Sequence, residues 1–250
     1  MSDLLPILLL AFVGSVAGLI GGLIFLFKEN WARKLCGYAV SFAAGVLLSV
    51  SLLHLIPEAH HEIGESAFLI VLLAFLGSFL FEQYFAHLHH HEDRKHTMLK
   101  SAVPLVIFGD TIHNFIDGVA IAAAYLTNPS FGLVVALATF LHETPHEIGD
   151  FGILMKAGWT KQKTFMVNLF SACATFPGAL FVYFFAQGAS EKIGVLLAIS
   201  AGIFLYLGAS DFLPEIEQED KKRPSWKNLV PLFIGVLIIY LLTFLSPHQH

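Results

Sequence analysis

Two apolar stretches in the middle of the chain carry acids and histidines at helical spacing. In residues 101–126, the polar positions recur every three or four residues and are Asp110, His113, Asn114 and Asp117. In residues 130–155, the same spacing gives Thr139, His142, Glu143, His146, Glu147 and Asp150. Such offsets place each set along one face of a helix. Imidazoles and carboxylates on two facing helices are the side chains that bind divalent transition metals.

Neither stretch contains a fixed positive charge, because no Lys or Arg occurs between Ser101 and Met155. Carboxylates buried in lipid without a positive partner are costly, and a mobile cation would complete them. One ion could be held by His113, Asp117, His142 and His146. Three imidazoles and a carboxylate suit tetrahedral Zn²⁺ and accept Fe²⁺, Mn²⁺ or Cd²⁺ less selectively. The charge pattern therefore predicts a zinc site.

The remaining polar groups leave other interpretations open. Asn114, Glu143 and Glu147 are close enough in sequence to support a second ion or to accept protons. A purely structural alternative is a polar network that only joins two helices.

Residues 142–146 also spell H-E-x-x-H, the zinc-protease helix motif, so an intramembrane metalloprotease using His142, Glu143 and His146 is the alternative function. Pro145 would distort that helix, and the extra His113 would close the open zinc position that hydrolysis needs. The sequence therefore predicts a protein that is not an enzyme and has no resident cofactor.

The composition indicates a membrane protein. Of 250 residues, 56% are hydrophobic and 13% are charged, against about a quarter charged in soluble proteins. The apolar residues fall in blocks of about 20, the length of a membrane-spanning helix. The sequence has no basic patch of the kind that binds nucleic acid, so no nucleic-acid partner is expected. We expect an all-α polytopic membrane protein with eight transmembrane helices, at residues 4–27, 35–58, 66–86, 101–126, 130–155, 164–187, 193–215 and 229–246.

The connections between these spans predict an orientation. All Lys and Arg residues except Lys192 fall in alternate connections, which the positive-inside rule assigns to the cytoplasm. Both termini are then outside. A signal peptide begins with basic residues, whereas this chain has Asp3 there. Residues 4–27 are therefore expected to remain in the mature protein as a membrane span. A plasma (inner) membrane of a prokaryote is the expected location.

A weak internal repeat relates the second and seventh spans. Residues 45–58 match residues 202–215 at a constant offset of 157, with a Pro-Glu pair ending both. Because the two spans run in opposite directions, the repeat is inverted, as in many secondary transporters. A chance similarity of two apolar helices is the alternative. The residues expected to line a transport pathway are His54, Glu58, Asp110, Asp150, Asp211 and Glu215. Helix-end positions at the membrane interface are the alternative for His54, Glu58, Asp211 and Glu215.

The connection at residues 87–100 is strongly polar and rich in histidine. We expect a cytoplasmic loop that binds transition metal loosely through His87, His89, His90, His91 and His96. A solvated linker is the alternative. Cys36 and Cys173 lie far apart in apolar sequence and are expected to be free thiols.

The two polar stretches closely resemble the paired signatures of the ZIP (Zrt/Irt-like) divalent metal transporters. The motifs are HNFIDG at residues 113–118 and HETPHEIGD at residues 142–150, and the likeness extends over essentially the whole chain. The resemblance implies one transmembrane transporter domain over residues 1–250, a 3+2+3 arrangement with inverted symmetry, homodimers, and alternating-access transport of zinc into the cytoplasm. It also implies a compact prokaryotic member.

The resemblance further implies a ligand set in the fourth and fifth spans. These residues are His113, Asn114, Asp117, His142, Glu143 and His146, with Glu147 nearby. Family members often add a polar residue of the sixth span to a second metal position. Here that region reads Ala174-Thr175-Phe176-Pro177, and Phe176 cannot ligate a metal.

Overall fold

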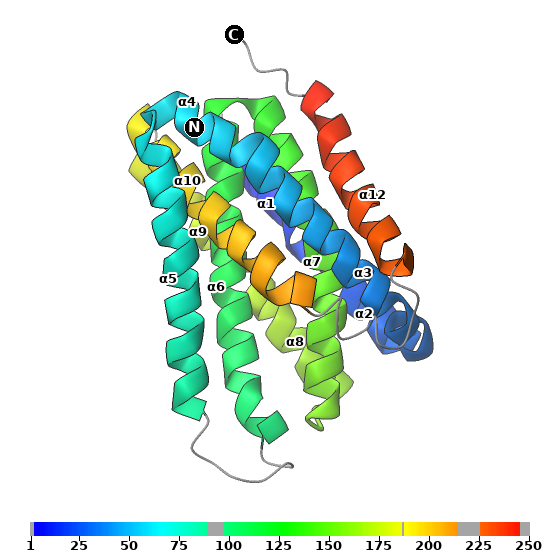
Figure 1. Ribbon diagram of the computed structural model, residues 1–250. Helices are drawn as coiled ribbons and strands as arrows, with labels where there is room; N and C mark the ends of the chain where they lie inside the picture. Colours follow the sequence, from blue (N-terminus) through cyan, green and yellow to red (C-terminus); the bar gives the residue numbers. More distant parts are fainter. Residues whose placement is uncertain (1–2, 90–97, 187, 215–225, 246–250) are drawn as a thin grey trace.

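A computed structural model describes residues 3–89, 98–186, 188–214 and 226–245 of the chain. Within these ranges every regular element is a helix, which confirms the predicted all-α class. Helices α6 (Met98–Thr127) and α7 (Pro129–Lys156) lie at the centre and contact each other and helices from both halves of the chain (Figure 1).

The remaining helices surround this central pair. Before it come α1 (Leu4–Gly14), the 3₁₀ turn η1 (Val16–Leu19), α2 (Ile20–Phe27), α3 (Glu29–Val50), the π turn η2 (Ser51–Leu55), α4 (Ile56–Ile63) and α5 (Ser66–His89). After it come α8 (Lys161–Ala172), α9 (Thr175–Ala186), α10 (Ser190–Tyr206), the π turn η3 (Leu207–Phe212), α12 (Trp226–Leu242) and the 3₁₀ turn η4 (Thr243–Leu245).

Six helical segments of the described chain are long and apolar enough to cross a membrane. They are Leu4–Phe27, Gly37–Ile63, Ser66–Tyr84, Val106–Thr127, Lys161–Ala186 and Ser190–Ser210. Helix α12 is apolar but shorter, at 17 residues. Helix α7 has 28 residues but carries three carboxylates in close succession and is not among the six. Together these segments make the chain a multi-pass membrane protein.

Two spans contain a π turn directly before a proline. The turn at Ser51–Leu55 precedes Pro57, and the turn at Leu207–Phe212 precedes Pro214. Proline has no N–H to donate to the carbonyl four residues earlier, and a locally widened turn is one way to accommodate this gap. The last residues of the two π turns, Leu55 and Phe212, stand at the same offset of 157 residues as the sequence repeat.

The first and sixth spans are also broken at corresponding positions. The first changes from α1 to a 3₁₀ turn at Ser15, and the sixth is interrupted between Ala172 and Thr175. The same 157-residue offset relates Ser15 to Ala172.

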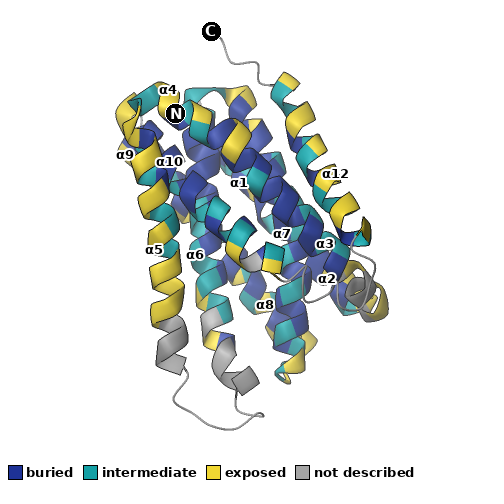
Figure 2. Ribbon diagram, in the orientation of Figure 1, coloured by how far each residue is buried: buried dark blue, intermediate teal, exposed yellow. Residues whose placement is uncertain are grey.

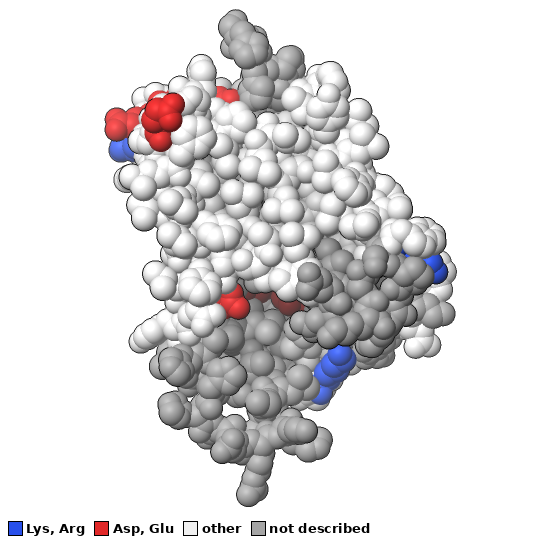
Figure 3. All heavy atoms as spheres, viewed as in Figure 1, with Lys and Arg blue, Asp and Glu red and all other residues white. Residues whose placement is uncertain are grey.

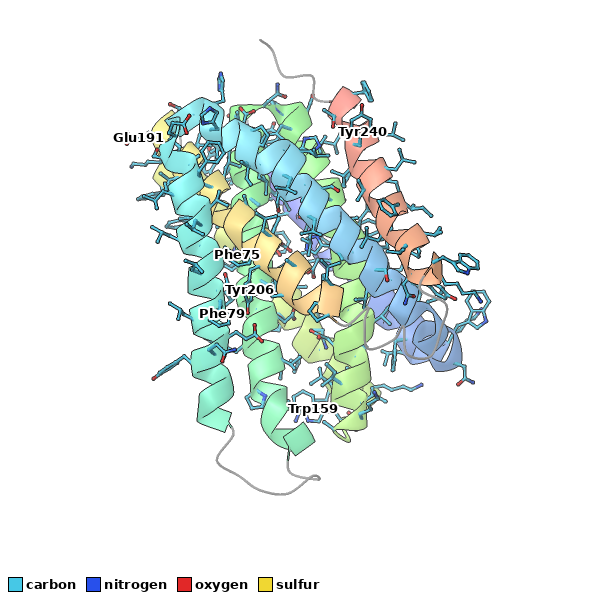
Figure 4. The ribbon with its side chains drawn as sticks, in the orientation of Figure 1. Phe75, Phe79, Trp159, Glu191, Tyr206 and Tyr240 are labelled. Carbon is cyan, nitrogen blue, oxygen red and sulfur yellow. The ribbon has the colours of Figure 1, made fainter. Side chains whose placement is uncertain are left out.

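Glycines bring the crossing helices of each half together at corresponding places. A Cβ on Gly45 of α3 would lie 2.1 Å from the Leu232 carbonyl oxygen of α12. A Cβ on Gly202 of α10 would lie 2.4 Å from the Val71 carbonyl oxygen of α5. Only glycine permits such close contact between helix backbones. On the α5–α10 side, Phe75 and Tyr206 add an edge-to-face ring contact (Figure 4).

Both described ends of the chain lie at the same end of the molecule as α4 (Figure 1). Lys156, Lys161 and Lys163 flank the α7–α8 connection, which lies toward the opposite end, where Figure 4 shows Trp159 and where Lys163 contacts its ring. Glu191 and Tyr240 mark the end that holds the termini (Figure 4). Buried residues are frequent along α3, α6, α7 and α10, whereas α5 and α12 expose apolar outer faces to the surroundings (Figure 2).

Candidate metal site

Helices α6 and α7 turn their polar stripes toward each other in the middle of the protein. The buried residues of these stripes are Asp110, His113, Asn114, Asp117, Thr139, His142, Glu143, Glu147 and Asp150. Only His146 of this set is partly exposed, with 23% of its side chain accessible. The predicted stripes are therefore buried together, as a shared ion requires.

Four ligand atoms form a compact group at the centre, which we term the four-ligand group: His113 Nε2, Asp117 Oδ2, His142 Nε2 and Glu143 Oε1. The two imidazole nitrogens are 3.1 Å apart, and His113 Nε2 is 3.1 Å from Glu143. The other measured pairs are 3.5 to 3.7 Å apart. Tetrahedral zinc with bonds of about 2.0 Å holds its ligand atoms about 3.3 Å apart. The group thus has the dimensions of a tetrahedral zinc site.

The surroundings orient one of the imidazoles. His142 Nδ1 lies 3.0 Å from the Ala138 carbonyl oxygen, and a proton donated there leaves Nε2 as the free ligand. The ring of Phe204 on α10 lies edge-on to His142 and His113, at centroid distances of 5.6 and 6.1 Å. This ring closes the group with an apolar wall, which keeps water out and strengthens the attraction for a cation.

Asn114 is held in a separate network beside the four-ligand group. Its amide oxygen accepts hydrogen bonds from the hydroxyls of Ser15 and Thr175. Its amide nitrogen donates to Asp110 Oδ1 at 2.9 Å. The Ala172 carbonyl oxygen also lies 3.1 Å from the Ser15 hydroxyl and 2.9 Å from the Thr175 hydroxyl, so each hydroxyl proton is shared between two acceptors. The breaks in the first and sixth spans thus meet at Asn114, whose amide aligns Asp110.

Two further groups of ligand atoms continue from the four-ligand group. One comprises Asp110, Glu143 and Glu147, and the other comprises Asp110, His146 and Asp150. In each group the ligand atoms lie within 4.8 Å of one another. Glu143 belongs to the four-ligand group as well, and Asp110 belongs to both of the others. The clustered acids and histidines therefore form a continuous series.

The sequence grouped His146 with His113, Asp117 and His142, whereas the structure has Glu143 in that place. His146 Nδ1 lies 3.6 Å from Asp110 and 3.9 Å from Glu143. Helices α6 and α7 are antiparallel neighbours. Asp117, one turn after His113, and His146, one turn after His142, therefore lie on opposite sides of the two paired histidines. Asp110, almost one turn before His113, lies beside His146.

The same geometry disfavours the metalloprotease. Such an enzyme holds zinc with both histidines of H-E-x-x-H and keeps the glutamate free as a base. Here His142 and His146 fall in different ligand groups, and Glu143 is itself among the ligand atoms.

Of the other predicted pathway residues, His54 and Glu58 lie apart from these groups. His54 is fully buried and faces the C-terminal helix, with Nε2 3.3 Å from the Ile239 carbonyl oxygen. Glu58 lies in α4 within 4.8 Å of ligand atoms of His61 and Glu62, at the end that holds the termini. For Asp211, the structure describes only the backbone, in the π turn η3.

Glu215 and the loop residues His90, His91 and His96 lie outside the described residues. His87 and His89 end helix α5, and their side chains are also not described.

Ser15, Thr175 and Phe204 were not identified from the sequence as parts of the site. A single serine, threonine or phenylalanine in an apolar span has no periodic signal. For Ser15 the only sequence signal was a polar residue in an otherwise apolar first span.

Small residues allow the outer helices to approach the site. A Cβ on Gly18 would lie 2.9 Å from the Glu143 Cβ, and one on Gly118 would lie 2.0 Å from the Thr175 carbonyl oxygen. The first and sixth spans can therefore pack directly against α7 and α6 beside the ligand groups.

Comparison with known proteins identifies similar sequences over most of the chain. The family model described as ZIP Zinc transporter matches residues 4–104 and 97–243. The mouse protein "Zinc transporter ZIP10" is 41% identical over 132 residues, which cover 53% of this chain and 16% of the relative. The fruit-fly protein "Zinc transporter foi" is 38% identical over 145 residues, 58% of this chain and 20% of the relative.

Human "Zinc transporter ZIP4" is 38% identical over 133 residues, 53% of this chain and 20% of the relative. The aligned part of this chain thus spans a fifth or less of the length of these three relatives.

Proposed function

We propose, since this chain belongs to the ZIP zinc transporter family, that it carries Zn²⁺ across a membrane by alternating access. The family consists of transporters and not of enzymes. The observation that carries the proposal is the four-ligand group, whose atoms are spaced for tetrahedral zinc between two buried helices. Fe²⁺, Mn²⁺ and Cd²⁺ are secondary substrates on the same ligand chemistry.

The full proposed ligand set is His113, Asn114, Asp117, His142, Glu143, His146 and Glu147. Four of these residues supply the four-ligand group. His146 and Glu147 belong to the neighbouring groups, and Asn114 acts through its hydrogen bond to Asp110.

The proposed architecture is one domain of eight spans in a 3+2+3 arrangement, with the first three spans related to the last three by inversion. The corresponding helix breaks, π turns and glycine contacts at one constant offset support this relation. Helix directions in Figure 1 are also consistent with it, because α3 and α10 run in opposite senses, as do α5 and α12. Inverted repeats that move against each other around a central site produce alternating access.

The proposed orientation puts the basic connections in the cytoplasm of a plasma (inner) membrane and both termini outside. Zinc would enter at the Glu58 end and leave past Asp110, His146 and Asp150. A surface cavity of about 580 Å³, lined in part by Glu62 and Glu191, lies at the outer end. His54, Asp211 and Glu215 are proposed as further pathway residues, and the loop histidines as loose cytoplasmic ligands. A homodimer is the proposed assembly.

Zinc uptake into vesicles tests the function. The purified full chain is reconstituted with a zinc-sensitive dye inside, and external Zn²⁺ is added. Wild type should give saturable dye fluorescence, and a His142→Ala, His146→Ala double variant should fall to the rate of empty vesicles. Glu65→Gln is the matched control, because this exposed carboxylate belongs to no ligand group of the described residues. Equal rates for wild type and the double variant would refute the proposal.

A further inference from the structure

Three lysines come together where the end of α2 lies beside the α7–α8 connection. Lys28 is the C-cap of α2, and Lys161 and Lys163 lie in the first turn of α8. The Lys161 ammonium donates to the Leu26 carbonyl oxygen at 2.8 Å, so the start of α8 is tied to the last turn of α2. All three lysine side chains are exposed. We term these three residues the lysine patch.

The protein holds the charges of the lysine patch in place without neutralising them. The chain has no Asp or Glu in residues 151–190, and none of the three lysines forms an ion pair with a carboxylate of the described residues. The Lys163 ammonium lies 3.7 Å from the centroid of the Trp159 ring. The Lys28 ammonium lies 5.9 Å from that of Trp31. Aromatic faces orient these cations but leave their full positive charge.

The start of α8 makes this charge more costly. Lys161 and Lys163 occupy the first turn of α8, which has no acidic residue. The first turn of a helix carries the positive end of the helix dipole, so it repels cations and stabilises anions. The lysine patch therefore favours a negative charge that the described part of the protein does not supply.

Apolar faces of α8 and α2 adjoin the lysine patch. On α8, Met166 and Phe170 are exposed and follow Lys163 by three and seven residues, which places all three on one face. On α2, Leu23 and Phe27 are exposed and precede the C-cap lysine. Each helix thus presents an apolar strip that ends at a lysine, and this pattern suits an acyl chain that ends at a charged headgroup.

The two apolar faces belong to neighbouring helices. Leu26 of α2 and Phe165 of α8 pack against the same buried cluster, which includes Phe25 and Phe151. The hydrogen bond from Lys161 joins the same two helices at their basic end. One lipid molecule can therefore contact both faces and the lysine patch at the same time.

We propose that the lysine patch and the adjoining faces of α2 and α8 bind an anionic phospholipid. Its phosphate lies among Lys28, Lys161 and Lys163, and its acyl chains lie along the two apolar faces. Clusters of basic residues at the membrane surface bind anionic headgroups, and tryptophan, here Trp159, is enriched at the same level of the membrane. The inference goes beyond the proposed function, because neither zinc nor the ligand groups take part in it.

A lipid in this place contacts both of the broken spans. Helix α2 follows the break at Ser15, and α8 precedes the break between Ala172 and Thr175. The hydroxyls of Ser15 and Thr175 both donate to the Asn114 amide oxygen. The lipid therefore stabilises two helices whose ends form the Asn114 network.

Quenching of tryptophan fluorescence by brominated lipids tests the proposal. The full chain carries Trp31→Phe and Trp226→Phe, which leave Trp159 as its only tryptophan, and is reconstituted in mixtures of phosphatidylglycerol and phosphatidylcholine with equal chains. Bromine is placed on the chains of one lipid or the other, so the two quenching curves give the relative affinity of the lipids beside Trp159. Phosphatidylglycerol should bind more tightly by more than about tenfold, because each lysine near the membrane surface contributes about fivefold.

Lysine variants locate the site. A Lys161→Gln, Lys163→Gln double variant should lose most of the preference for phosphatidylglycerol, whereas Lys192→Gln should retain it. Lys192 is a matched control, because it also donates to a helix-end carbonyl, that of Phe185 at 3.2 Å, and lies over the ring of the same residue. It differs in lying next to Glu191, at the end that holds the termini.

A single variant separates lipid binding from folding. Lys163→Gln leaves the hydrogen bond of Lys161 intact and should lower the preference by about fivefold, whereas Lys163→Arg keeps the charge and should keep the preference. Equal affinity of wild type for the two lipids, or an undiminished preference in Lys163→Gln and in the double variant, overturns the proposal. Loss of the preference when inorganic phosphate is added at constant ionic strength would assign the patch to free phosphate and also overturn it.

Discussion

At the scale of single residues, the spacing of four ligand atoms decides which chemistry the protein can perform. His113, Asp117, His142 and Glu143 lie at distances that fit tetrahedral coordination. Two imidazole nitrogens only 3.1 Å apart either share a proton or share a cation.

Asp117→Asn should weaken zinc binding without altering the size of the side chain. The amide keeps one oxygen but loses the negative charge that offsets the ion, so the dissociation constant should rise by more than about tenfold. Competition against a fluorescent zinc chelator measures this constant in detergent. Glu65→Gln removes the same charge from the surface and should leave the constant unchanged. An unchanged constant for Asp117→Asn would exclude Asp117 as a ligand.

Asn114→Leu should destabilise the fold rather than remove a ligand alone. It leaves the Asp110 carboxylate without its amide donor, and the hydroxyls of Ser15 and Thr175 keep only their shared contact with the Ala172 carbonyl among the contacts described above. A buried polar group that loses its partner costs about 1–3 kcal/mol, so the unfolding temperature should fall. Ser15→Ala removes one hydroxyl but leaves the amide in place, and should lower it less. Thermal unfolding in detergent measures the unfolding temperatures of both variants. Equal unfolding temperatures for Asn114→Leu and wild type would show that the Asn114 network adds no stability.

The sequence predicted the residue types of the site but not their partners. Periodicity placed His113 and His142 on facing surfaces, because three- and four-residue spacing is a property of the helix itself. The exchange of His146 for Glu143 depends on the antiparallel register of α6 against α7, which no single helix encodes. The contacts of Asn114 with Ser15 and Thr175 depend on tertiary packing across 99 and 61 positions of sequence.

At the scale of helices, close packing positions the site. Helices α6 and α9 approach through two reciprocal contacts. A Cβ on Gly178 would lie 2.0 Å from the Phe115 carbonyl oxygen, and one on Gly118 equally close to that of Thr175. Each contact joins a glycine on one helix to a backbone carbonyl on the other, so neither helix can shift without losing both.

Gly178→Ala should force α6 and α9 apart and destabilise the protein by about 1–3 kcal/mol, the usual cost of overpacking. Gly77→Ala on α5 is the control, because its Cβ would meet nothing within 4 Å. That substitution should leave the unfolding temperature unchanged or slightly higher, since alanine favours helix. Both variants can be compared by thermal unfolding in the same detergent. An equally stable Gly178→Ala variant would mean that the helices separate at no cost.

The helix breaks show what sequence can predict at this scale. The sequence repeat pairs Pro57 with Pro214, and the structure has a π turn that ends two residues before each of them. The break at Ser15 has no proline and was not predicted. The correspondence between Ser15 and Ala172 appears only once the two spans are seen to end their regular helices at the same offset.

At the scale of the whole molecule, the clustered acids and histidines differ in exposure. His146 is 23% exposed, whereas His142 and Asp117 are fully buried. His146 also lies closer in sequence to Lys156 and the basic connections than the four-ligand group does. Figure 3 shows a few acidic atoms near the middle of the molecule, at the border between the white and the grey surface. Among the clustered acids and histidines of the described residues, His146 is the most exposed.

This difference in exposure predicts an asymmetric labelling pattern. In a background with Cys36 and Cys173 replaced by Ser, His146→Cys should react with a membrane-impermeant thiol reagent added on the face of the basic connections. His142→Cys should react much more slowly, because position 142 is fully buried. Sealed vesicles of known orientation provide the measurement. Faster labelling of His146→Cys from the face that holds the termini would contradict the proposed pathway.

The histidine-rich loop should modulate transport rather than perform it. Replacing His87, His89, His90, His91 and His96 with Ser leaves every ligand group of α6 and α7 intact. Zinc uptake into vesicles should persist, with a changed apparent affinity. Complete loss of uptake by a folded variant would mean that essential ligands lie in the loop.

The acidity of α7 has a consequence for how the protein is made. Unlike its neighbours, α7 is not apolar enough to be recognised as a span by itself, and each central carboxylate adds roughly 2.5–3.5 kcal/mol to the cost of entering lipid. A single residue, Asn128, separates it from α6. During synthesis the two helices therefore have to enter the bilayer as a hairpin that hides its acids between them. Neutralising Glu147 should make that insertion easier, even if the resulting protein moves less metal.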